Sequence, residues 1–117
     1  MKISFLLFMF FYVTKSNAQL PVVSSGIVKR IDSLQSKFIS PPNIDVWLPE
    51  GYTTEKKYAV LYMHDGQMLF DSSITWNHQE WHADEIAGKL IRENNIKEII
   101  IVGIQLFVWY KCWYLGV

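Results

Sequence analysis

The clearest pattern along this chain is a short apolar run that ends abruptly in polar residues. Residues 58–63 read Tyr-Ala-Val-Leu-Tyr-Met, and residues 64–67 read His-Asp-Gly-Gln. A run that is apolar on both faces and rich in β-forming residues predicts a strand buried inside a parallel sheet. Asp-Gly is a turn signal, and Gly66 is expected to supply a positive φ there. Because ligands bind at the carboxyl ends of strands in open α/β sheets, His64 to Met68 should lie at the edge of any site.

Three further segments have strand patterns. Residues 44–48 alternate, which predicts a half-exposed strand with Ile44, Val46 and Leu48 on one face and Asp45 and Trp47 on the other. Residues 99–104 are apolar and largely β-branched, and they predict a second buried parallel strand. Residues 26–38 alternate loosely and predict an interrupted first strand. The short proline-containing connection at 40–43 indicates that the first two strands form an antiparallel edge.

One segment has helical periodicity. Apolar positions between residues 78 and 93 recur at intervals of three and four, and Asn94 with Asn95 is a reasonable exit. Asn77 can cap this helix, and Glu80 makes a capping box available. Strand 58–64, helix 78–93 and strand 99–104 together predict a βαβ unit in an α/β fold.

Composition limits the classes of function. The chain has 117 residues, of which 50% are hydrophobic, and this is enough for one small domain. Its formal net charge of +0 gives no reason to expect a nucleic-acid partner. Cys112 is the only cysteine, so the chain has neither an internal disulfide nor a paired-cysteine metal site.

The first 18 residues have the features of a secretory signal peptide. Lys2 precedes an apolar run at 3–13, and Ser16 to Ala18 form a small-x-small cleavage signal before Gln19. The run is shorter than the ~20 residues that span a bilayer. We therefore expect cleavage between Ala18 and Gln19, export to the periplasm or exterior, and no stable membrane insertion afterwards. An uncleaved membrane anchor is the alternative. The expected organisation is a signal peptide at 1–18, a linker at 19–25, a folded part at 26–104 and an aromatic tail at 105–117.

Several blocks of this sequence resemble the esterase D and enterochelin esterase-like branch of the α/β-hydrolases. They are Ile-Asp-Val-Trp-Leu-Pro-Glu-Gly-Tyr at 44–52, the segment 58–67 followed by Phe70 and Asp71, Trp81 with Asp84 and Glu85, and Ile-Val-Gly-Ile at 101–104. The resemblance covers roughly residues 26–104. It implies the N-terminal part of an α/β-hydrolase sheet, with antiparallel edge strands followed by a parallel βαβ unit. It also implies a serine hydrolase that acts on carboxylic esters, including acylated sugars, without a cofactor.

Two features depart from the family pattern. The nucleophile of that family lies in a Gly-x-Ser-x-Gly elbow, and no such motif occurs here. After Ile104 the family usually continues with a polar segment, whereas residues 105–117 contain five aromatic residues and one charged residue. We therefore expect a fragment that ends before the Ser-Asp-His triad, after a frameshift or premature stop near Gln105. A genuine short variant is the competing interpretation.

By resemblance, the first oxyanion-hole donor is the backbone N–H of Gln67 or of Met68. The second donor, from the residue after the nucleophile, is absent from this chain. The alternative is that Asp65, Gly66 and Gln67 form only a turn.

Other candidate groups fit structural roles better. His78 and His82 are four residues apart, but Gln79 replaces the glutamate of the zinc-protease motif, so we expect no metal site. His64 is expected to be a hydrogen-bonded structural residue. His64, Asp65 and Ser72 lie too close in sequence for a triad. Packing is the expected role of the tryptophans at 47, 76 and 81, and Cys112 has no nucleophile motif around it.

Two hypotheses about function follow. The first is the N-terminal fragment of a secreted serine ester hydrolase, inactive alone. The second is a small non-catalytic α/β binding module. In both, the strand at 58–63 would become an exposed sheet edge, which predicts poor solubility or self-association through that edge.

Overall fold

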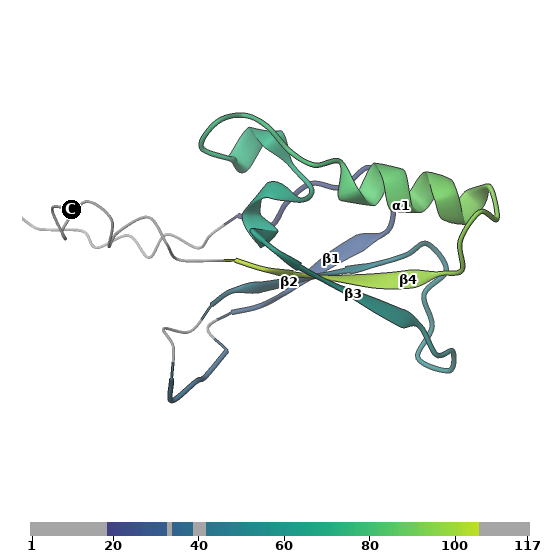
Figure 1. The fold of residues 1–117 in the computed structure, drawn as a ribbon, viewed down its shortest axis with the longest axis horizontal. Coiled ribbons are helices and arrows are strands. Elements are labelled where there is room, and N and C mark those ends of the chain that lie inside the picture. The colour runs from purple at the N-terminus through teal and green to yellow at the C-terminus, as the bar shows by residue number, and fades with distance from the viewer. Residues whose placement is uncertain (1–18, 33, 39–41, 106–117) are drawn as a thin grey trace, which may run out of the picture.

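The computed structural model describes residues 19–32, 34–38 and 42–105. These form one mixed sheet with a helix and two short 3₁₀ turns on one side (Figure 1). In chain order the elements are β1 (Ile27–Ile31), β2 (Ile44–Leu48), β3 (Ala59–His64), η1 (Gly66–Met68), η2 (Ser72–Ile74), α1 (Ala83–Arg92) and β4 (Ile99–Ile104). The predicted α/β class is thus confirmed. None of the described helices is long and apolar enough to cross a membrane.

The strands lie side by side in the order β1-β2-β4-β3. β1 pairs antiparallel with β2, as predicted, and β2 pairs antiparallel with β4. β3 pairs in parallel with β4, with Leu61 opposite Ile101, which confirms the βαβ unit. β3 is therefore an edge strand in this chain. Five of its six residues are exposed, so its expected burial inside a sheet is not achieved here.

The core lies between the sheet and α1. Trp47 of β2 and Ile101 of β4 pack there with Leu69, Phe70 and Ala87. The alternation in β2 was predicted correctly, but which of its faces is buried was not. Trp47 is fully buried and Asp45 is 1% exposed, because the indole Nε1–H donates to Ser25 O at 2.7 Å and Asp45 is paired with Arg30.

The first strand and the helix are shorter than predicted. β1 ends at Ile31 rather than near residue 38. α1 begins at Ala83 rather than at 78, and the capping-box prediction is wrong, because the N-cap is His82 and no side chain caps it. His78 and His82 both have positive φ, which interrupts a helix there. Asn77 instead accepts from the backbone N–H of Gln79 at 3.2 Å.

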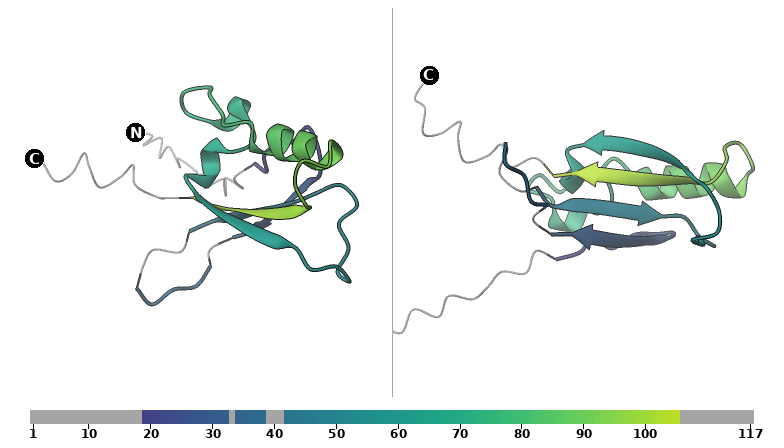
Figure 2. Two further views of the ribbon diagram at one scale, coloured as in Figure 1. Left: turned by 45° about the vertical axis from the view of Figure 1, so that its right-hand side comes forward. Right: turned by 90° about the horizontal axis from the view of Figure 1, so that it is seen from below.

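The segment at 19–25 lies against the body of the domain through hydrogen bonds to two aspartates. The backbone N–H of Val22 donates to Asp71 at 2.8 Å. The backbone N–H and hydroxyl of Ser24 both donate to Asp84, at 2.7 and 2.9 Å. Asp71 and Asp84 are 8% and 1% exposed. The entry into β1 is thus held across the side of the sheet that carries α1 (Figure 2).

Candidate functional site

The turn that follows β3 is built from Asp65 and η1. Asp65 takes the left-handed conformation, with φ at 53°, in the place that the sequence assigned to Gly66. The backbone N–H of Met68 donates to Asp65 O at 2.8 Å, which closes the 3₁₀ turn. The backbone N–H of Gln67 has no acceptor among the described residues. Of the two predicted oxyanion donors, only Gln67 is therefore available to a ligand.

Gly66 is required for a different reason from the one predicted. A Cβ at this position would lie 2.6 Å from the carbonyl carbon of Gly103 and 2.8 Å from its oxygen. The turn after β3 is thus pressed directly onto the backbone of β4. This contact fixes the position of Gln67 relative to the carboxyl end of the parallel pair.

A cavity of about 250 Å³ lies beside this turn. Its lining includes Gly66 and Gln67 of the turn. The apolar side chains of Phe70 and Ile74 and the buried pair of Arg30 and Asp45 also line it. The side-chain Oε1 of Gln67 is buried and has no hydrogen-bond partner within the described part of the chain. The candidate site therefore combines an unused backbone donor and an unused side-chain acceptor on one residue.

The ion pair beside the cavity was not foreseen from the sequence. Arg30 Nε and Nη2 donate to Asp45 Oδ1 and Oδ2 at 2.6 and 2.8 Å. Gln105 Nε2 donates to the same carboxylate at 2.9 Å. The hydrogen bond to Asp45 raises the pKa of Arg30, although burial opposes it. The sequence contained a sign of this ion pair, because Arg30 and Asp45 stand in two segments that were predicted to pair as antiparallel strands.

Two of the predictions about histidine and tryptophan need correction. His64 is exposed at the end of β3 rather than enclosed as a structural residue. Of the three tryptophans, Trp47 is buried in the core, whereas Trp76 and Trp81 are 69% and 48% exposed. Cys112 and the expected cleavage point at Ala18 lie outside the described residues, whereas Gln19 is the first described residue.

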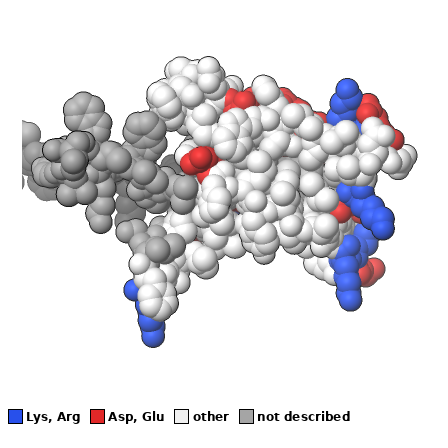
Figure 3. All heavy atoms as spheres, viewed as in Figure 1, with Lys and Arg blue, Asp and Glu red and all other residues white. Residues whose placement is uncertain are grey.

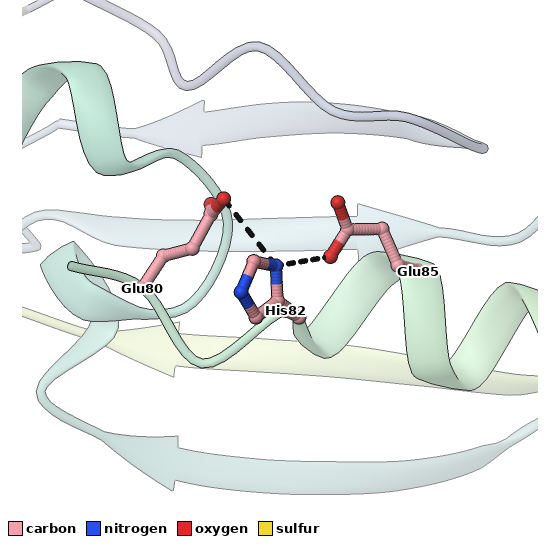
Figure 4. A group of neighbouring side chains, drawn as sticks. All are labelled: Glu80, His82 and Glu85. Atoms are coloured by element: carbon pink, nitrogen blue, oxygen red, sulfur yellow. Dashed lines mark hydrogen bonds and ion pairs between the residues drawn. The ribbon is translucent and has the colours of Figure 1, made fainter.

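Glu80, His82 and Glu85 form a group at the start of α1 (Figure 4). His82 Nδ1 lies 2.5 Å from Glu85 Oε2 and 3.4 Å from Glu80 Oε1. Burial raises the pKa of Glu80, while the His82 imidazole opposes that shift. All three ligand atoms lie within 4.8 Å of one another, so these residues have the donor types that bind divalent cations. An imidazole between two carboxylates is equally well explained as an ion pair, and the absence of a metal site stays a prediction.

The larger hollow of the molecule is far from this turn. It has a volume of about 630 Å³ and is lined by Lys56, Lys57, Lys97 and other residues near the amino ends of β3 and β4. Figure 3 shows that basic side chains gather at that end, whereas the end near η1 has few charges. This hollow is therefore not adjacent to Gln67.

Comparison with known proteins gives a family. Residues 36–106 match the protein family described as "Putative esterase". Among solved structures, the CE1 ferulic acid esterase of the anaerobic fungus Anaeromyces mucronatus, without substrate, is 30% identical, with a TM-score of 0.50 over 72% of this chain and 30% of that chain. The same enzyme in complex with ferulic acid is 28% identical, with a TM-score of 0.49 and the same coverage. A feruloyl esterase module from Clostridium thermocellum, complexed with sinapinate, is 22% identical, with a TM-score of 0.47 over 72% of this chain and 28% of that one.

Proposed function

From the premise that this chain belongs to the esterase family, we propose that it forms the N-terminal part of a secreted serine hydrolase of carboxylic esters. It covers 30% of the length of the ferulic acid esterase that it resembles. Esters of hydroxycinnamic acids, of which ferulic acid is one, are the first substrates to try. No cofactor is required by this chemistry.

The observation that carries the proposal is the backbone N–H of Gln67, which has no acceptor among residues 19–32, 34–38 and 42–105. It lies directly after the carboxyl end of a parallel strand, on a turn held by the contact between Gly66 and Gly103. A donor that is fixed before the reaction stabilises the negative charge that develops on the carbonyl oxygen during acyl transfer. Gln67 would supply the first donor of the oxyanion hole, and the residue after the nucleophile would supply the second.

We further propose that this chain is inactive alone. It has no Gly-x-Ser-x-Gly elbow, and half an oxyanion hole without a nucleophile cannot form an acyl-enzyme. The purified chain should not hydrolyse a chromogenic acetate ester above background. Hydrolysis that a serine-directed inhibitor abolishes would contradict this part of the proposal.

Export follows from the signal-like segment at 1–18. We propose that cleavage leaves Gln19 as the first residue of the mature chain. The N-terminal sequence of protein recovered from the periplasm or medium tests this directly. A product that begins at Met1 and stays with the membrane would favour the uncleaved anchor.

The decisive test begins with the gene. Translation of all frames beyond the codon for Ile104 should reveal a polar segment and, further on, a Gly-x-Ser-x-Gly elbow. In a protein that carries both parts, Gln67→Pro removes the backbone donor and should lower kcat by about 10²–10³. Gln67→Ala keeps the N–H and is the matched control, which should lose far less of kcat. Equal activity of the two variants would exclude Gln67 from the oxyanion hole.

A second candidate is a non-catalytic binding module. The observation that favours it is the free edge of β3, which offers unpaired backbone groups and an exposed Leu61 and Tyr62 to a partner strand. If no reading frame continues the family pattern, and the folded chain captures an extended peptide, this alternative replaces the hydrolase. The two candidates thus predict different results from the reading-frame search and from the peptide-binding assay.

A further inference from the structure

Gln19 is the residue with which the exported chain is proposed to begin, and it lies beside the candidate site. Its backbone carbonyl oxygen accepts a hydrogen bond from Arg30 Nη1 at 3.1 Å. Gln19 also lines the cavity of about 250 Å³ that Gln67 lines. The start of the mature chain and the candidate oxyanion donor therefore border the same cavity.

The position of Gln19 is set by its neighbours in the fold. Arg30, which donates to it, is held by its two hydrogen bonds to Asp45, and the Arg30 side chain is only 6% exposed. Further along the segment, the backbone N–H of Val22 donates to Asp71 at 2.8 Å. The segment 19–22 is thus attached to the domain at both of its ends, through contacts within the described part of the chain.

The backbone nitrogen and the side-chain amide of Gln19 are both available for reaction. Within residues 19–32, 34–38 and 42–105, Gln19 makes its one hydrogen bond through the carbonyl oxygen. The residue is exposed, and neither its backbone nitrogen nor its side-chain amide has a partner there. An N-terminal glutamine in this state can close a lactam ring, because its amine reaches the carbonyl carbon of its own side chain.

We propose that Gln19 is a modification site, at which the mature N-terminus cyclises to pyroglutamate and stays bound to Arg30 beside the cavity. The α-nitrogen attacks Cδ of the side-chain amide, so that a bond between these two atoms forms and the bond between Cδ and Nε2 breaks. Nε2 leaves as ammonia with a proton from the α-nitrogen, and no oxidant, reductant or co-reactant is consumed. The backbone carbonyl oxygen takes no part in the reaction and remains the acceptor for Arg30.

Charge favours the lactam over a free terminus at this position. Among the described residues that line the cavity, Arg30 and Asp45 carry the charges, and these neutralise each other. A free α-ammonium on Gln19 would add a positive charge to the residue that Arg30 contacts. Like charges this close repel each other, whereas a lactam has no charge. Cyclisation should therefore stabilise the bound position of the segment that enters β1.

The modification depends on one part of the proposed function, the cleavage between Ala18 and Gln19. The full-length chain is expressed in an exporting host, and mass spectrometry gives the intact mass and the N-terminal peptide of the recovered protein. We expect the mass of residues 19–117 less one ammonia. A chain that begins at Gln19 and keeps its ammonia after prolonged incubation at neutral pH would overturn the cyclisation alone. A chain that begins at any other residue would overturn the cleavage as well.

Gln19→Ser is the matched variant, because it keeps the backbone carbonyl oxygen but has a free amine that cannot cyclise. Hydrogen exchange of the peptide 20–26 is compared in the two mature proteins at about pH 6, where an α-ammonium is charged. The wild type should exchange several-fold more slowly than Gln19→Ser. This difference should shrink above about pH 9, because the amine of the variant is then neutral. Equal exchange of the two proteins at the lower pH would overturn the binding of the lactam to Arg30.

Discussion

At the scale of single residues, buried carboxylates hold together segments that are far apart in the sequence. Asp71 accepts hydrogen bonds from the backbone N–H of Val22 at 2.8 Å and from the backbone and hydroxyl of Ser73 at 2.9 and 2.6 Å. Asp84 accepts from the backbone N–H and hydroxyl of Ser24 through one oxygen. Together they fix the segment that enters β1 against the loop after β3 and the first turn of α1.

Asp71→Asn should destabilise the domain by about 1–3 kcal/mol at pH 7, because an amide cannot accept all three of these hydrogen bonds. The Ser73 hydroxyl and then the Val22 backbone lower the pKa of Asp71. A lowered pKa means that the carboxylate stabilises the fold above the ordinary aspartate pKa and that this contribution is lost as pH falls through the lower folded-state value.

Urea unfolding of both proteins between pH 7 and pH 2 measures this. The difference in unfolding free energy between the wild type and Asp71→Asn should have its full value at pH 7 and decrease as the pH falls. Asp32→Asn is the control, because Asp32 is exposed after β1, and it should leave the unfolding free energy nearly unchanged. A pH-independent difference would exclude the titration of Asp71 as the cause.

Gly66→Ala should destabilise the domain more than Gly103→Ala. The new methyl group at 66 would meet the backbone of Gly103 at 2.6 Å, whereas at 103 it would first meet the side chain of Leu69 at 2.8 Å. A side chain can rotate away, but backbone cannot, so a cost of about 1–3 kcal/mol or more is expected at 66. Thermal unfolding of the two variants gives the order, and the reverse order would contradict the backbone contact.

Residue-scale predictions from sequence failed where partners are distant. Alternation in β2 identified two faces correctly but could not show that Asp45 lies inside, because its partner Arg30 is 15 residues away. Likewise, a non-glycine residue in the left-handed conformation is hard to recognise from sequence. His82 has that conformation, and the helical pattern around it did not indicate that the helix begins only at the next residue.

At the scale of elements, one ion pair joins β1 to β2 and also accepts a hydrogen bond from the residue that follows β4. Arg30 belongs to β1 and Asp45 to β2, and Gln105, immediately after β4, donates to the same carboxylate. The side chains of Arg30 and Asp45 are 6% and 1% exposed, so neither charge can be left alone without a large desolvation cost.

Arg30→Met should therefore destabilise the domain by about 3–5 kcal/mol, since Asp45 would keep a buried charge without its partner. The double variant with Asp45→Leu should recover much of this loss. Lys56→Met is the control, because it removes an exposed ion pair to Glu98 and should hardly change stability. Chemical denaturation of the wild type, Arg30→Met, Asp45→Leu and the double variant measures the coupling energy between the two residues. Arg30→Met as stable as the wild type would refute the assignment.

Elements were predictable where one pattern dominated. Residues 44–48 and 99–104 are the strands that alternation and the β-branched run had indicated. The exit of the helix was also foreseen, because Asn94 takes the positive φ that asparagine tolerates better than most residues. The start of α1 and the end of β1 were predicted wrongly, because the periodic pattern in the sequence extends beyond the residues whose backbone is helical or extended.

At the scale of the whole molecule, the described residues form a helical layer on one face of the sheet, and β3 is the edge strand among them (Figure 1). Val60, Leu61 and Tyr62 are 44%, 46% and 69% exposed on this strand. An apolar edge strand with unpaired backbone groups is a template for association with another chain. The sequence predicted this edge from the resemblance, not from any local pattern.

Leu61→Lys should reduce self-association through this edge, because a charge on an edge strand opposes pairing. Leu61 lies on the same side of the sheet as Ile101, so the substitution leaves the opposite side of the sheet unchanged. Sedimentation velocity at increasing concentration should show larger species for the wild type than for the variant. A wild-type chain that stays monomeric throughout would refute edge association.

The strand order has a consequence for synthesis. β2 and β3 are separated in the sheet by β4, which is the last strand along the described part of the chain. Before residue 104 has left the ribosome, β3 has no neighbour, and only the β1–β2 hairpin can pair. Arrested nascent chains of increasing length should therefore stay sensitive to protease at first, because an isolated hairpin is marginally stable, and acquire the whole sheet in a single step once β4 has emerged.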